Sequence, residues 1–102
     1  MAKRQPKTKA KWNTSETDIL ARAFLSMKDS GEMKAFMRDL LTESEIIEFG
    51  KRFFAARSLA SGVQYTDIVQ ATGLSSRTIA RIQKWVTQGK GGYRLATARL
   101  KK

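Results

Sequence analysis

Apolar residues recur every three to four positions along most of the chain, which is the spacing of amphipathic α-helices. The first such segment, residues 15–28, is preceded by three good N-cap side chains at positions 13–15. The Asp-Ser-Gly sequence at 29–31 should end this helix, and a second, shorter helix is expected over residues 32–41. The pattern therefore predicts two short amphipathic helices in the first part of the chain.

A third helix is predicted to begin at a capping box. The hydroxyl of Thr42 can cap the helix while the carboxylate of Glu45 reaches back to the Thr42 N–H, and the helix should stop at Gly62. Its apolar residues cover more than one face: Ile46, Ile47, Phe49, Phe53, Phe54, Ala55, Ala56, Leu59 and Ala60. A helix this apolar needs neighbours on several sides. Because two adjacent phenylalanines cannot both be well buried in so small a monomer, we expect an obligate homodimer.

Residues 65–88 carry the most informative pattern, which predicts a helix, a tight turn and a second helix. Gly73 lies where the first helix must end in a left-handed turn, which glycine adopts at little cost. Ser75 or Ser76 can cap the second helix. Apolar anchors follow at helical spacing on both sides of the turn: Ile68, Val69, Leu74, Ile79 and Ile82. This is the layout of a helix-turn-helix, whose second helix enters the DNA major groove; an ordinary helical hairpin with a charged outer face is the alternative.

The remaining sequence completes an all-α chain. A glycine-rich break at 89–92 separates the second helix of the motif from a last short helix over residues 93–100. No strand pattern, internal repeat or sustained heptad is present, so about six helices and no sheet are expected. We expect residues 1–13 to form a basic arm that is disordered alone, and residues 14–102 to form one helical domain.

The charge distribution favours a phosphate-bearing partner. The net charge is +11, and eight of the nine acidic residues lie between positions 16 and 48. After Glu48 there are eleven Lys or Arg residues and a single acid, Asp67. Such asymmetry attracts phosphate, although a solvated basic face or a cationic membrane-binding surface would also produce it. A membrane-surface helix would carry a large exposed apolar face, which the residues after Gly62 do not require.

Five cations lie in the arm, where no acid accompanies them, and are candidate phosphate contacts: Lys3, Arg4, Lys7, Lys9 and Lys11. The arm could follow DNA phosphates, or it could serve only as a solubilising tail.

The sequence contains no residues that would obviously carry out enzyme catalysis. Cysteine and histidine are both absent, so disulfides, thiolate nucleophiles and the commonest general base and metal ligand are excluded. The only acidic cluster is Glu43, Glu45 and Glu48, and helix capping explains part of it. We expect no enzyme activity, no metal and no cofactor. With no bilayer-spanning apolar run and no signal peptide, a cytoplasmic, nucleoid-associated protein is expected.

We expect DNA contacts from the second helix of the motif and its flanks, through Thr66, Ser75, Ser76, Arg77, Ala80, Arg81 and Lys84. Arg77, near the helix N-terminus, is best placed for a bidentate contact to guanine, and Ala80 can meet a thymine methyl group. The two serines and the backbone amides at the helix start suit a phosphate, while the lysine and the threonine mainly position the protein. For each of them, a solvated surface side chain is the alternative.

From Phe36 to Leu100 the chain resembles the tryptophan repressor superfamily, in particular its YerC/YecD branch. The match is carried by several short pieces in order: 39–45 (DLLTESE), 50–52 (GKR), Gly62, Tyr65 with Ile68, Thr72-Gly73, Ser76 with Thr78, Ile79 and Arg81, and Gly92-Tyr93. The resemblance implies an all-helical, interlocked homodimer whose helices before the motif exchange between subunits. It also implies that the two recognition helices face successive major grooves.

The tryptophan repressor holds free tryptophan between two arginines, which Arg52 and Arg81 match, and Thr42 matches a threonine near the ligand. Ile82, however, stands where the repressor has a glycine, and Trp85 where it has a small serine. Bulky side chains in the cavity make ligand entry costly by overpacking. We therefore expect no tryptophan corepressor and interpret both arginines as structural or phosphate-contacting.

Three functions remain open at this point. The leading hypothesis is a homodimeric, sequence-specific regulator of transcription that binds double-stranded DNA. The alternatives are a non-specific, architectural nucleic-acid-binding protein and a protein-interaction module with a degenerate helix-turn-helix.

Overall fold

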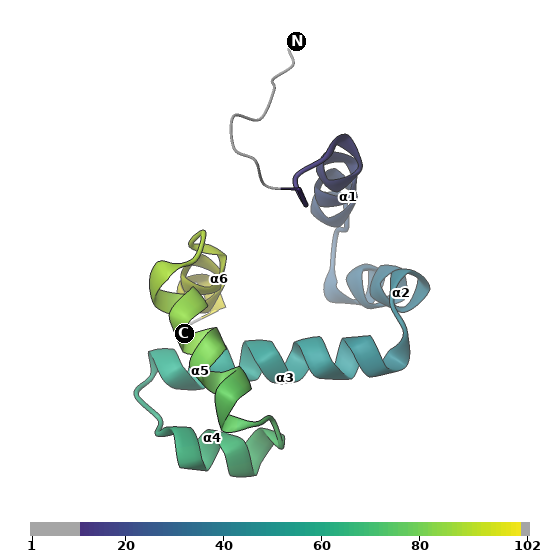
Figure 1. Cartoon of the computed structure of the whole chain (residues 1–102). Helices are drawn as coiled ribbons and strands as arrows, with labels where there is room; N and C mark the ends of the chain where they lie inside the picture. The colour runs from purple at the N-terminus through teal and green to yellow at the C-terminus, as the bar shows by residue number, and fades with distance from the viewer. Residues whose placement is uncertain (1–10, 101–102) are drawn as a thin grey trace. The chain divides into compact units, whose positions relative to one another are not determined.

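The computed structural model describes residues 11–100, and within that range it contains six α-helices and no strand (Figure 1). The helices are α1 (Ser15–Leu25), α2 (Ser30–Leu40), α3 (Glu43–Ala60), α4 (Tyr65–Thr72), α5 (Ser76–Gln88) and α6 (Gly92–Leu100). The predicted all-α architecture is confirmed. Of the predicted basic arm, Lys3, Arg4, Lys7 and Lys9 lie outside the described residues, while Lys11 is exposed.

Side-chain caps explain most of the helix boundaries. The hydroxyl of Thr14 accepts the N–H of Thr17 at 3.2 Å and begins α1. At the start of α3, Thr42 Oγ1 accepts the N–H of Glu45 at 3.1 Å, and Glu45 Oε1 accepts the N–H of Thr42 at 2.9 Å. The predicted capping box is thus confirmed. The helix ends near the expected position, with Gly62 in the left-handed region at φ 89°.

The break between α1 and α2 lies earlier in the chain than the sequence pattern predicted. Helix α1 ends at Leu25 rather than at residue 28, and the hydroxyl of Ser26, its C-cap residue, satisfies the carbonyl of Ala23 at 2.7 Å. Helix α2 begins at Ser30 instead of residue 32. Asp29 Oδ1 accepts the N–H of Glu32 at 2.9 Å, and this cap holds the Ser-Gly pair in the first helical turn. The prediction that Ser30 and Gly31 lie between the two helices is therefore wrong.

The chain divides into two compact units at residue 40. In the first, α1 and α2 meet through an edge-on contact between the rings of Phe24 and Phe36, whose centroids are 5.3 Å apart. No side chain of either helix is buried. Leu25 remains 83 % exposed. This pair of helices therefore has apolar surface but no core of its own.

The second unit holds the hydrophobic core. Helix α3 contacts α4, α5 and α6, and α5 also contacts α4 and α6. The buried apolar residues are Ala55, Ala56, Ile68, Leu74, Ile79 and Ile82. The two alanines of α3 are fully buried, and their small side chains allow the other helices to approach closely. The core thus fixes α5 against the second half of α3.

Large apolar side chains of α3 point away from this core. Ile47 is 59 % exposed, Phe49 is 46 % exposed and Phe54 is 49 % exposed. Phe53 is half-buried, and its ring stacks on that of Tyr93 in α6 with a centroid distance of 6.3 Å. The several apolar faces of this helix are therefore only partly covered within one chain.

Candidate nucleic-acid interface

The turn between α4 and α5 is built as the sequence predicted. Gly73 ends α4 in the left-handed region at φ 78°, and its N–H donates to the carbonyl of Val69 at 2.8 Å. Leu74 then turns inward and is 7 % exposed. Ser75, in extended conformation, caps α5 by accepting the N–H of Thr78 at 3.1 Å. Of the two serines considered as caps, Ser75 is therefore the cap, and Ser76 is the first residue of the helix.

Thr72, named above only as part of the family resemblance, is a structural element of this turn. It is the buried polar residue of the described chain, at 6 % exposure. Its hydroxyl donates to the carbonyl of Ile68 at 2.7 Å and accepts the N–H of Leu74 at 3.1 Å. The side chain thus links the last turn of α4 to the first residue after the glycine. A threonine directly before a turn glycine is the local signal that could have revealed it.

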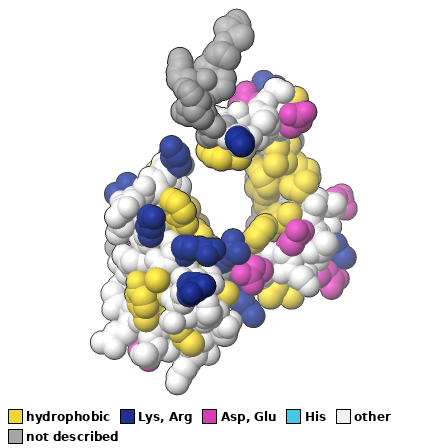
Figure 2. All heavy atoms as spheres, in the orientation of Figure 1, with side chains coloured by type: hydrophobic (Ala, Val, Ile, Leu, Met, Phe, Trp, Pro, Cys, Tyr) yellow, Lys and Arg dark blue, Asp and Glu magenta, His cyan; other side chains and the backbone are white. Residues whose placement is uncertain are grey.

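Helix α5 has one buried face and one charged face. Ile79 and Ile82 are 0 % and 3 % exposed, so Ile82 belongs to the core as expected. Arg77, Arg81 and Lys84 are exposed and separated by four and three positions, which places them on one face. Figure 2 shows Lys and Arg side chains gathered over the region of α5.

The other predicted contact residues are exposed as well. Ala80, Ser75 and Ser76 are exposed on or beside the first turns of α5, and Thr66 is exposed in the first turn of α4. The hydroxyl of Ser75 is already engaged, since it pairs with Thr78 Oγ1 at 3.0 Å as well as capping the helix. The structure therefore leaves all seven candidates exposed within the helix-turn-helix.

The charged side chains on the exposed face of α5 are all positive. No acidic residue occurs after Asp67 in the sequence, and neither Arg77, Arg81 nor Lys84 forms an ion pair with a described residue. Lys84 has a different neighbour: its Nζ lies 5.6 Å from the centroid of the Trp85 ring. The face offers positive charge without internal neutralisation, which suits an anionic partner.

Arg52, the first of the two arginines in the family resemblance, has partners within its own helix. Its Nε lies 3.2 Å from Glu48 Oε2, and its guanidinium lies 5.7 Å from the centre of the Phe49 ring. Trp85, which was expected to fill a ligand cavity together with Ile82, is 49 % exposed on the flank of α5.

Other kinds of site find little support in the described part of the chain. Among residues 11–100 no three acidic side chains come together in a group that could hold a metal ion. None of the described helices is both long and apolar enough to cross a bilayer.

Comparisons with known proteins agree on one family. The sequence profile described as Trp repressor protein matches residues 15–101. The chain is 37 % identical over 86 residues to the uncharacterized protein YerC of Bacillus subtilis, covering 84 % of this chain and 83 % of that protein. The crystal structure of a TrpR-like protein from Eubacterium eligens superposes with a TM-score of 0.83 at 36 % identity, covering 88 % of this chain and 93 % of that one. The chain belongs to the Trp repressor protein family.

Proposed function

We propose that this protein is a sequence-specific DNA-binding regulator of transcription that places α5 in the major groove. The observation that carries the proposal is the exposed face of α5, where Arg77, Arg81 and Lys84 lie opposite the buried Ile79 and Ile82. Membership in the Trp repressor family supports the same conclusion. The proposal assigns the chain no enzyme activity.

The side chains of the face take different roles in the proposed complex. Arg77 lies in the first turn of α5 and reads a guanine through two parallel hydrogen bonds. Ala80 contacts a thymine methyl group. Because the Ser75 hydroxyl is used for capping, Ser76 is the better phosphate ligand of the two serines. Lys84 and Thr66 position the protein on the backbone.

The proposed active species is a homodimer. Helices α1 and α2 bury no side chain within the chain, and α3 exposes Ile47, Phe49 and Phe54. Apolar surface of this extent is stabilised by a second copy that covers it. A two-fold dimer also presents two copies of α5, so the preferred site should be palindromic.

Selection of bound sequences from a random DNA pool tests the proposal. An enriched palindrome is expected, and its half-site spacing gives the separation of the two recognition helices. The variant Arg77→Ala should lose about 1–3 kcal/mol on the preferred site and little on random DNA. Arg99→Ala is the matched control, since Arg99 is an exposed arginine of α6 outside the motif.

A second candidate function rests on the charge asymmetry alone. A non-specific nucleic-acid-binding protein would use the same basic surface without reading bases. In that case the selection would enrich no sequence, and unrelated duplexes would bind equally at fixed salt. An interaction module that no longer reads DNA would fail to bind even at low salt.

A further inference from the structure

Trp85 is a large aromatic side chain of α5 that remains 49 % exposed. It follows Arg81 by four positions, so the two side chains are neighbours on one flank of the helix. The buried side of the helix is occupied by Ile79 and Ile82. The ring therefore borders the exposed basic face and is no part of the hydrophobic core.

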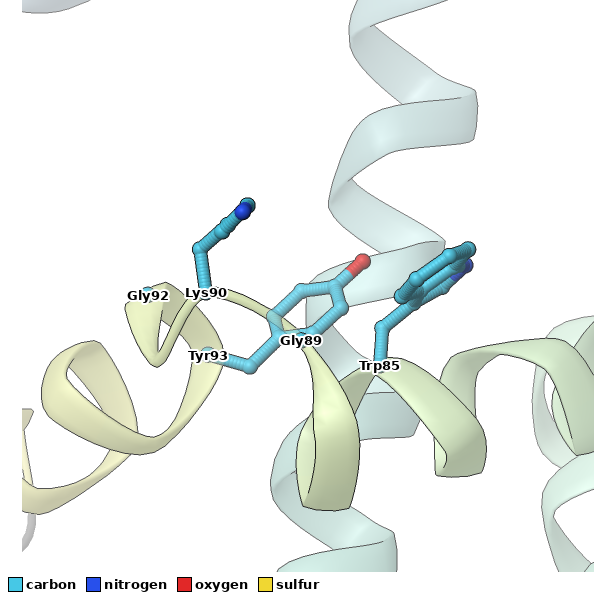
Figure 3. Close-up of a pocket in the computed structure, with 5 residues that line it drawn as sticks. All are labelled: Trp85, Gly89, Lys90, Gly92 and Tyr93. Atoms are coloured by element: carbon cyan, nitrogen blue, oxygen red, sulfur yellow. The ribbon is translucent and has the colours of Figure 1, made fainter. Parts of the chain in front are cut away.

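The indole group of Trp85 has an unused hydrogen-bond donor. An indole carries one N–H and no acceptor, and this N–H donates to no described residue. The ammonium group of Lys84 lies 5.6 Å from the centre of the ring. In Figure 3 the indole nitrogen lies on the edge of the ring that faces away from Tyr93. An open hollow of about 410 Å³ lies beside the ring at the junction of α5 and α6, and its lining residues are Trp85, Gly89, Lys90, Gly92 and Tyr93.

The proposed docking of α5 brings this donor to the wall of the major groove. Recognition helices contact base edges through their N-terminal residues. Trp85 lies eight residues beyond Arg77, which is about 12 Å further along the helix axis. The major groove is about 12 Å wide and about 8.5 Å deep. A side chain at that height on the flank of the helix therefore meets sugar and phosphate instead of base edges.

We propose that Trp85 is a DNA-backbone contact, which donates its indole N–H to a phosphate oxygen and holds the ammonium group of Lys84 toward the same strand. The inference rests on the proposed binding of DNA by α5, and it adds a residue that positions the protein without reading bases. The cation–π contact keeps the lysine beside the ring. One neutral donor and one charged donor are thus presented to the backbone together.

Affinity measurements with Trp85→Phe test the contact, on the preferred palindrome and on unrelated duplexes. Phenylalanine keeps an aromatic ring but lacks the N–H, so binding should weaken by about two- to tenfold, the value of one hydrogen bond. The loss should be equal on both kinds of duplex, because a phosphate contact carries no base preference. Tyr93→Phe is the matched control, since it removes one hydroxyl from the other aromatic wall of the hollow and should bind like the parent protein.

The salt dependence of binding separates the tryptophan from the lysine. Trp85→Phe removes no charge, so the slope of log affinity against log salt concentration should stay unchanged. Lys84→Gln should reduce the magnitude of that slope by about 0.9, which corresponds to one phosphate. Trp85→Leu also removes the cation–π contact and should therefore weaken binding more than Trp85→Phe does.

Proton NMR of a Trp12→Phe protein observes the contact directly, because Trp85 is then the remaining tryptophan of the chain. Its indole N–H should exchange with water in the free protein, and the signal should move downfield when DNA is added.

The possible outcomes distinguish this contact from the proposed function. If the parent protein binds DNA and Trp85→Phe binds equally well, the contact is refuted while the proposed function stands. A parent protein that binds no DNA would refute both. An equal loss in Tyr93→Phe would attribute the effect to packing at the junction of α5 and α6. An indole N–H protected from water in the free protein, as expected if a second copy of the chain covers the ring, would also overturn the assignment.

Discussion

Replacing Thr72 by valine should destabilise the protein through one hydrogen bond in the turn of the helix-turn-helix. Valine has the shape of threonine but lacks the hydroxyl that accepts the Leu74 N–H at 3.1 Å. The carbonyl of Ile68 keeps its helical partner, so the main loss is at the Leu74 N–H. Thr72 is 6 % exposed, which leaves water little access to that group. A buried donor without a partner costs about 1–3 kcal/mol.

The matched variant is Thr72→Ser, which keeps the hydroxyl and removes only a methyl group. It should cost about 0.8 kcal/mol, the transfer free energy of one buried carbon. For a domain of this size, 1 kcal/mol corresponds to roughly 4–8 °C in melting temperature. The valine variant should therefore melt about 4–24 °C below the parent protein. The serine variant should melt only a few degrees below it.

Thermal unfolding followed by circular dichroism measures both variants, at one fixed chain concentration because association shifts the melting temperature. DNA affinity at a temperature where all three proteins are folded provides a second readout. If the hydroxyl positions α5, the valine variant should lose more affinity for the preferred site than the serine variant. A valine variant as stable as the parent, or a serine variant that is the less stable of the two, would refute the reasoning.

Three further predictions concern the oligomeric state, the binding of free tryptophan and the N-terminal basic arm. Sedimentation at micromolar concentration should show a single species of twice the chain mass, and a stable folded monomer would contradict the interlocked arrangement. Titration with free tryptophan should give no heat beyond dilution, since Ile82 is buried in the core; a saturable site would contradict this. Deleting residues 2–11 should flatten the salt dependence of DNA binding by roughly two to four units and leave base preference unchanged. An unchanged salt dependence of DNA binding would mean that the arm serves only as a solubilising tail.

Features that depend on a few neighbouring residues were predictable from the sequence. The capping box at Thr42, the left-handed Gly73 and the inward positions of Ile79 and Ile82 each follow from a local pattern, and the structure contains all of them. The start of α2 was missed because a cap at Asp29 outweighs the low helix propensity of the Ser-Gly pair that follows.

Features that depend on the packing of distant helices were not predictable. The stacking of Tyr93 on Phe53 brings together residues forty positions apart, and no periodicity within α3 or α6 indicates it. The same holds for the hollow at the junction of α5 and α6, where Trp85, Gly89 and Tyr93 are among the lining residues (Figure 3). Trp85 was assigned to a ligand cavity by analogy with the family, whereas it is half-exposed here, because analogy fixes a position on the helix but not the direction of a larger side chain.

The location of the core has a consequence for synthesis on the ribosome. Among residues 11–100 every buried apolar side chain lies between positions 55 and 82, whereas α1 and α2 bury none. The N-terminal helices are made first, yet the core of the chain is complete only about 40 residues later. At typical translation rates of 5–20 residues per second, this delay is about 2–8 s. During that time α1 and α2 have only each other to pack against, and chaperones that recognise apolar segments have access to them before folding is complete.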